Sequence, residues 1–91
     1  MSACDPLIYT GLSSEKWYAI RDMVGAEFGF DIVTDSGRAN INGFAVQWNW
    51  DAATGTLRIT CLDSPWWAAC STINSHIDGF VQKGLAAVAA P

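Results

Sequence analysis

Two turn signals near the middle of the chain separate three stretches of alternating apolar and polar residues, and this pattern constrains the fold most. Asn42 and Gly43 form a strong two-residue hairpin signal, because both central positions of a type I′ turn need a positive φ angle. Gly55 supplies a left-handed position for a second turn. The sequence therefore predicts an antiparallel meander, with strands at about residues 37–41, 44–50 and 56–62.

The alternation also predicts which residues face each other. Closing the second hairpin places six apolar residues on one face: Trp50 with Leu57, Trp48 with Ile59, and Val46 with Cys61. The first hairpin adds Ile41 and Ala39 to that face, opposite Phe44 and Val46. The other face carries mainly polar residues: Arg38, Asn40, Gln47, Asn49, Arg58 and Thr60, with Ala45 and Leu62 the apolar exceptions. One buried face and one wet face are typical of an antiparallel meander.

Helical spacing of apolar residues predicts one helix before the meander in the sequence and one after it. The first helix is expected over about residues 14–28, with Ser13 as its N-cap and Gly29 as its end. The second is expected over about residues 65–84, with Ser64 as its N-cap and Pro65 in its first position. An apolar stripe supports this second helix: Trp66, Cys70, Ile73, Ile77, Phe80, Val81 and Val88. The first eight or so residues are interpreted as an extended lead-in.

These elements together predict a single α+β domain over residues 1–91. We expect a two-layer α-β-β-β-α arrangement, in which both helices pack on the apolar face of a three-stranded sheet.

Charge and composition limit the partners of the chain. The formal net charge is −4, with only five Lys and Arg residues. A nucleic-acid partner is not expected, because binding nucleic acid requires a basic surface. An anionic membrane surface is disfavoured for the same reason. No basic region precedes an apolar core at the N-terminus, and no apolar run approaches ~18 residues, so neither a signal peptide nor a membrane span is expected.

Three cysteines, Cys4, Cys61 and Cys70, make an odd number without metal-ligand spacing. We expect packed thiols in a reducing, cytoplasmic setting, with a Cys61–Cys70 disulfide as the less favoured alternative. Cys70 and His76 would lie about 120° apart on one helix, which argues against a thiol–imidazole pair. The carboxylates at predicted turns and caps are interpreted as backbone-bonding residues: Asp31, Asp35, Asp51 and Asp63. No catalytic site, metal site or cofactor is therefore expected.

The hypothesis that follows is a small, non-catalytic protein-interaction module, which binds a protein partner or a second copy of itself. The residues assigned to that surface are Arg38, Gln47, Asn49 and Arg58 on the polar sheet face, and Trp67 at the edge of the helical stripe. The alternative is a domain that binds a small apolar ligand between sheet and helices. It rests on an interior whose large rings need not close-pack: Trp48, Trp50, Trp66 and Phe80.

Overall fold

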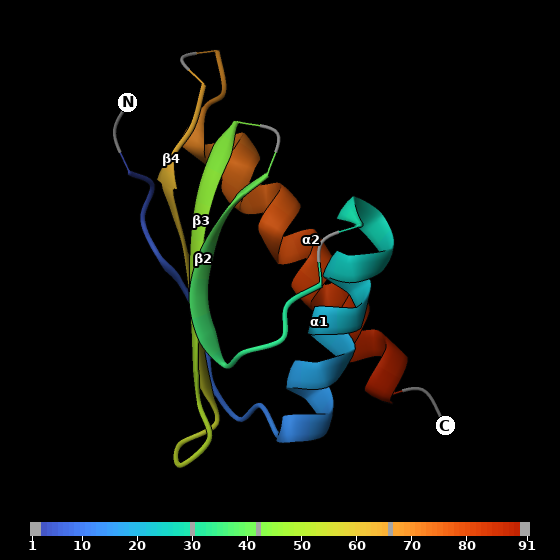
Figure 1. Ribbon diagram of the computed structural model, residues 1–91. Coiled ribbons are helices and arrows are strands. Elements are labelled where there is room, and N and C mark those ends of the chain that lie inside the picture. Colours follow the sequence, from blue (N-terminus) through green and yellow to red (C-terminus); the bar gives the residue numbers. More distant parts are fainter. Residues whose placement is uncertain (1–2, 30, 42, 66, 90–91) are drawn as a thin grey trace.

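The structure is a computed structural model that describes residues 3–29, 31–41, 43–65 and 67–89. Its elements follow in the order β1 (Leu7–Tyr9), α1 (Ser14–Phe28), β2 (Ser36–Ile41), β3 (Phe44–Asp51), β4 (Thr56–Asp63) and α2 (Cys70–Ala89). The sheet forms one layer and the two helices form the other (Figure 1). The α+β class and the two-layer arrangement predicted from the sequence are confirmed.

The sheet has four antiparallel strands in the order β1-β4-β3-β2, so the predicted three-stranded meander was incomplete. The extended lead-in supplies the additional strand, because Leu7 pairs with Ile59 and Tyr9 pairs with Leu57. Backbone pairing continues upstream, where the Cys4 amide donates to the Cys61 carbonyl at 2.9 Å. The register predicted for β2, β3 and β4 is confirmed, including the Ala39–Val46, Trp48–Ile59 and Trp50–Leu57 pairs.

Helix α1 occupies the predicted residues, and both of its ends are capped as expected. The Ser13 hydroxyl accepts a hydrogen bond from the Lys16 amide at 3.3 Å. Gly29 adopts a left-handed conformation with φ of 67°, and its amide donates to the Gly25 carbonyl. Asn42 and Trp66, which carried a predicted turn position and part of a predicted helical stripe, lie outside the described residues.

Helix α2 begins at Cys70, so the predicted start at residue 65 was wrong. The Ala68 amide donates to the Pro65 carbonyl at 3.0 Å, which closes a turn after Pro65. Ser64 does not cap a helix there: its own amide donates to the Asp63 carboxylate at 2.9 Å. The local cap signals at Ser64 and Pro65 therefore belong to a turn between β4 and α2.

The two helices meet where α2 carries a glycine. A Cβ atom built on Gly84 would lie only 2.9 Å from the Cα atom of Ile20, far inside normal contact distance. Gly84 therefore allows α1 and α2 to approach closely, and the helix continues past it to Ala89 instead of ending there. None of the helices in the described part of the chain is both long and apolar enough to cross a membrane.

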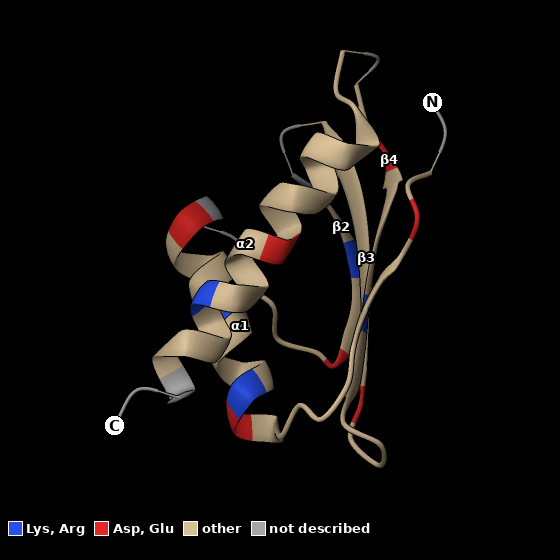
Figure 2. Ribbon diagram, turned by 180° about the vertical axis from the view of Figure 1, so that it is seen from behind, with Lys and Arg blue, Asp and Glu red and all other residues tan. Residues whose placement is uncertain are grey.

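The main core lies between the inner face of the sheet and the helices. Two of its rings, Trp17 and Trp50, stack with their centroids 6.3 Å apart and their planes inclined by 19°. The rest of the buried cluster comes from both layers: Leu12, Ile20, Trp48, Leu57, Ile59 and Val81. Within the described residues, both helices lie on the inner side of the sheet and neither covers its outer face (Figures 1 and 2).

Candidate functional site

An apolar cavity of about 590 Å³ lies between the inner face of the sheet and the two helices. Small-molecule sites in proteins typically measure ≈ 300–1,000 Å³ and are mostly apolar, with a few polar groups. Residues from both layers and from the connections between them line this cavity, so it is a concavity within the fold and not a flat patch. It is the candidate functional site of the chain.

The sheet contributes alternate residues of β3 and one residue of β4 to the wall: Phe44, Val46, Trp48 and Ile59. Strand alternation directs all four toward the helices, which is the face that the sequence predicted as apolar. The Trp48 ring packs directly against Gly37 of β2. A Cβ atom on Gly37 would lie only 3.0 Å from the ring, so the absence of a side chain there leaves room for Trp48.

The polar atoms of two of the lining tryptophans, Trp17 and Trp48, are already engaged. The Trp48 indole N–H donates to the Thr34 carbonyl at 3.1 Å, and the Trp17 indole N–H donates to the Asp35 carboxylate at 3.1 Å. Both acceptors lie in the segment between α1 and β2. The rings therefore present hydrocarbon to the cavity, because their only hydrogen-bond donors are satisfied elsewhere.

The helices supply the opposite wall. Helix α1 contributes Trp17, Ile20 and Val24, and α2 contributes residues at helical spacing: Thr72, Ile73, His76, Ile77, Phe80 and Val81. Because α1 and α2 are held together at Gly84 and Ile20, the two helical walls are fixed relative to each other. Of the rings expected around a ligand, Trp48 and Phe80 line the cavity, whereas Trp50 is packed against Trp17 in the core.

Trp67 stands at the rim of this cavity, in the turn between β4 and α2. Its side chain is 66% exposed, and its ring meets Phe44 edge to face with centroids 6.1 Å apart. Trp67 is one of the residues that the sequence predicts for an interaction surface. Its contact with Phe44 places it on the inner side of the sheet, beside the cavity.

A shallow surface depression adjoins the apolar cavity along α2. It is lined by residues with hydroxyl or imidazole side chains: Ser71, Thr72, Ser75 and His76. Thr72 and His76 line both spaces, so the apolar wall passes directly into a border of hydroxyl and imidazole groups. Nothing in the sequence marked this border, because serine, threonine and one histidine on a helix usually form a solvated face.

The four polar residues predicted as a partner-binding surface lie together on the outer face of the sheet. Arg38 pairs with Gln47 across β2 and β3, and Asn49 pairs with Arg58 across β3 and β4. All four are exposed, and Ile8 of β1, paired with Arg58, is 58% exposed beside them. The structure thus separates the predicted set: four residues share this face, whereas Trp67 lies on the opposite side of the sheet.

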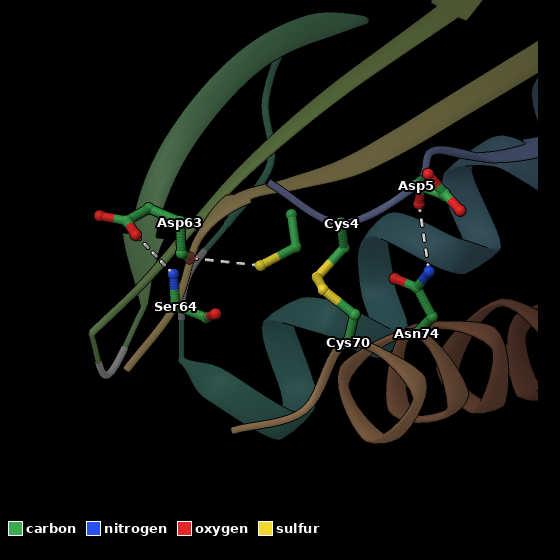
Figure 3. Close-up of a disulfide and its surroundings, with 7 residues drawn as sticks. Cys4, Asp5, Asp63, Ser64, Cys70 and Asn74 are labelled. Atoms are coloured by element: carbon green, nitrogen blue, oxygen red, sulfur yellow. Dashed lines mark hydrogen bonds between the residues drawn. A yellow bond between two sulfur atoms is a disulfide. The ribbon is translucent and has the colours of Figure 1, made fainter. Parts of the chain in front are cut away.

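The cysteines pair differently from either expectation. Cys4 and Cys70 form a disulfide with their Cα atoms 5.4 Å apart, which joins the lead-in to the start of α2 (Figure 3). Asn74, one turn further along α2, donates to the Asp5 carbonyl at 3.1 Å and ties the same two segments (Figure 3). Cys61 remains a free thiol that is fully buried, and burial raises its pKa above the ordinary value.

Residues able to bind a metal ion do not gather in the described part of the chain, where no three His, Cys, Asp or Glu side chains form a suitable group. Basic and acidic residues are spread over both layers (Figure 2). The predicted backbone-bonding carboxylates include Asp51, which accepts from the Ala53 amide at 2.9 Å. Comparison with known protein families, curated proteins and solved structures found no match.

Proposed function

We propose that this protein is a non-catalytic binding domain that holds a small apolar molecule between its sheet and its helices. The observation that carries the proposal is the 590 Å³ cavity, whose walls are almost entirely hydrocarbon and come from both layers of the fold. An apolar ligand of that size would remove these walls from water and gain roughly 25 cal/mol for each Å² of apolar surface buried.

An uncharged naphthyl fluorophore provides a direct test, because its emission rises when it moves from water into an apolar site. The test variant is Val24→Phe, which adds a ring to the α1 wall of the cavity. The matched control is Val33→Phe, which makes the same change at a side chain that is 75% exposed and outside the cavity lining.

We expect Val24→Phe to weaken fluorophore binding by at least about tenfold, which is 1.4 kcal/mol, and Val33→Phe to leave it unchanged. Thermal denaturation of each variant would check that both remain folded. Absence of any saturable binding by the parent protein, or equal binding by the two variants, would contradict the proposal. Native mass spectrometry of the purified protein would add a search for a co-purified molecule.

A second candidate function is binding of a protein partner through the outer sheet face. The supporting observation is the exposed group of Arg38, Gln47, Asn49 and Arg58, which places two of the five cationic residues of an acidic chain on one uncovered surface. Charge complementarity favours a partner with acidic side chains.

Light scattering over a range of protein concentrations would show whether this outer face instead binds a second copy. If an acidic partner is recovered, Arg58→Ala should weaken its binding and Arg21→Ala should not, since the Arg21 side chain donates to the Ile32 carbonyl elsewhere in the molecule. Equal effects of both substitutions would contradict this assignment.

The disulfide bears on the compartment in which the domain acts. Disulfides form and persist in oxidising compartments and are rare in the cytosol. The Cys4–Cys70 bond therefore favours an oxidising setting over the cytoplasmic one expected from the sequence.

A further inference from the structure

The shape and the border of the apolar cavity indicate which kind of molecule it would hold. We propose that the ligand is a single-chain amphiphile, with its alkyl chain in the cavity and an uncharged hydrogen-bonding headgroup at the border formed by Thr72 and His76. This inference rests on the proposed function and adds to it the chemical class of the ligand.

The cavity follows α2 over more than two helical turns. Its lining on that helix runs from Thr72 to Val81, which is about 14 Å at a rise of 1.5 Å per residue. Beyond Thr72 the lining continues through Ala69 and Ala68 to Trp67. An alkyl chain can lie along an apolar wall of this length.

A border of hydrogen-bonding side chains lies beside this cavity. Thr72 and His76 are one helical turn apart and line both the apolar cavity and the shallow depression, which Ser71 and Ser75 complete. Hydroxyl groups and a neutral imidazole can each donate and accept hydrogen bonds. A molecule that occupied both spaces would therefore need an apolar body and a hydrogen-bonding end.

The charge of the lining favours an uncharged headgroup. Among the described residues that line the two spaces there is no Lys, Arg, Asp or Glu. A charged group that leaves water needs an opposite charge or several hydrogen bonds to offset its desolvation. The net charge of −4 adds a further penalty for an anionic headgroup. A hydroxyl headgroup carries no charge, so it avoids both the desolvation of a charge and the repulsion by the negative net charge.

The test compares decanol with the headgroup-free naphthyl fluorophore, which decanol should displace. Thr72→Val keeps the shape of the side chain and removes its hydroxyl, and His76→Leu removes the imidazole. Both residues are exposed, so the substitutions leave the core intact. Ser14→Ala is the control, because Ser14 is an exposed serine on α1 that lines neither space.

We expect Thr72→Val to weaken decanol binding by roughly threefold to tenfold, the worth of one hydrogen bond. The same substitution should not weaken binding of the fluorophore, because valine keeps an apolar side chain of the same shape at this point of the wall. His76→Leu should act in the same direction, Thr72→Ser should restore decanol binding, and Ser14→Ala should have no effect. Decanoate and decyltrimethylammonium should both bind more weakly than decanol.

Two outcomes would overturn the inference in distinguishable ways. If the fluorophore and decanol both bind but neither Thr72→Val nor His76→Leu affects decanol, the headgroup assignment is wrong and the apolar site stands. If neither compound binds the parent protein, the apolar site itself is wrong and the amphiphile assignment falls with it.

Discussion

Gly79 and Gly84 have the same residue type in the same helix, yet the structure gives them different roles. In the sequence both are glycines inside a helix, where glycine is less favourable than alanine. A Cβ on Gly84 would collide with the backbone of Ile20, whereas a Cβ on Gly79 would have nothing within 4 Å. The sequence could not distinguish them, because the difference depends on where the partner helix crosses.

This difference predicts opposite effects of the same substitution. Gly84→Ala should destabilise the protein by about 1–3 kcal/mol, because overpacking forces the helices apart. Gly79→Ala should stabilise it by up to about 1 kcal/mol, because alanine favours helix more than glycine does. Urea denaturation of both variants would measure the two changes in the free energy of unfolding. Equal effects would contradict the proposed close approach at Gly84.

Strand β1 is the element that the sequence analysis did not find. It is only three residues long, and its partner β4 lies about 50 positions further along the chain. The two strands are therefore not joined by a hairpin turn whose residues could predict the pairing. Tyr9 adds a second attachment, because its hydroxyl donates to the Asp78 carboxylate of α2 at 2.7 Å. Burial, and then the Asp78 carboxylate, raise the pKa of the Tyr9 hydroxyl well above its ordinary value.

The raised pKa of Tyr9 predicts a loss of stability at alkaline pH. Above about pH 10, Tyr9 in the unfolded chain loses its proton while folded Tyr9 keeps it, so the unfolded state binds fewer protons and the free energy of unfolding falls with rising pH. Below that pH the contribution is fully present. Urea denaturation from pH 8 to pH 11 should show a steeper fall for the parent protein than for Tyr9→Phe. Parallel curves would contradict the shift.

At the scale of the whole molecule, the apolar residues on both sides of the cavity followed from the sequence, including Ile73, Ile77, Phe80 and Val81 of α2, whereas the start and the path of α2 did not. Strand alternation predicted that Val46, Trp48 and Ile59 share one face, and they form the sheet wall. The start of α2 and its path over the sheet depend on the Cys4–Cys70 bond and on the close approach at Gly84. Both are contacts between distant parts of the chain, which local patterns do not contain.

The disulfide predicts a large contribution to global stability. Cys4 and Cys70 are separated by 66 residues, and closing a loop of that length in the unfolded chain corresponds to about 4 kcal/mol. The double variant Cys4→Ser, Cys70→Ser should lose about this much free energy of unfolding. Reductant should bring the parent protein toward the stability of the variant and leave the variant unchanged.

Alkylation provides the check on which cysteines are paired. Denatured protein without reductant should take up one alkyl group, at Cys61, and three after reduction. In the native state Cys61 should resist alkylation, because its thiol is fully buried and its pKa is raised. Three adducts without reductant would show that the disulfide is absent.

The same bond determines how the molecule would respond to mechanical tension. A pulling force applied at the two ends of this chain would pass from Cys4 through the sulfur atoms into Cys70 and then along α2. The covalent path of the force would bypass the intervening residues, which include α1 and all four strands of the sheet, while the bond is intact. The bond closes a loop of 66 residues, which at about 3.5 Å per residue corresponds to roughly 230 Å of contour length. This length could not be extended by the force until the bond is reduced.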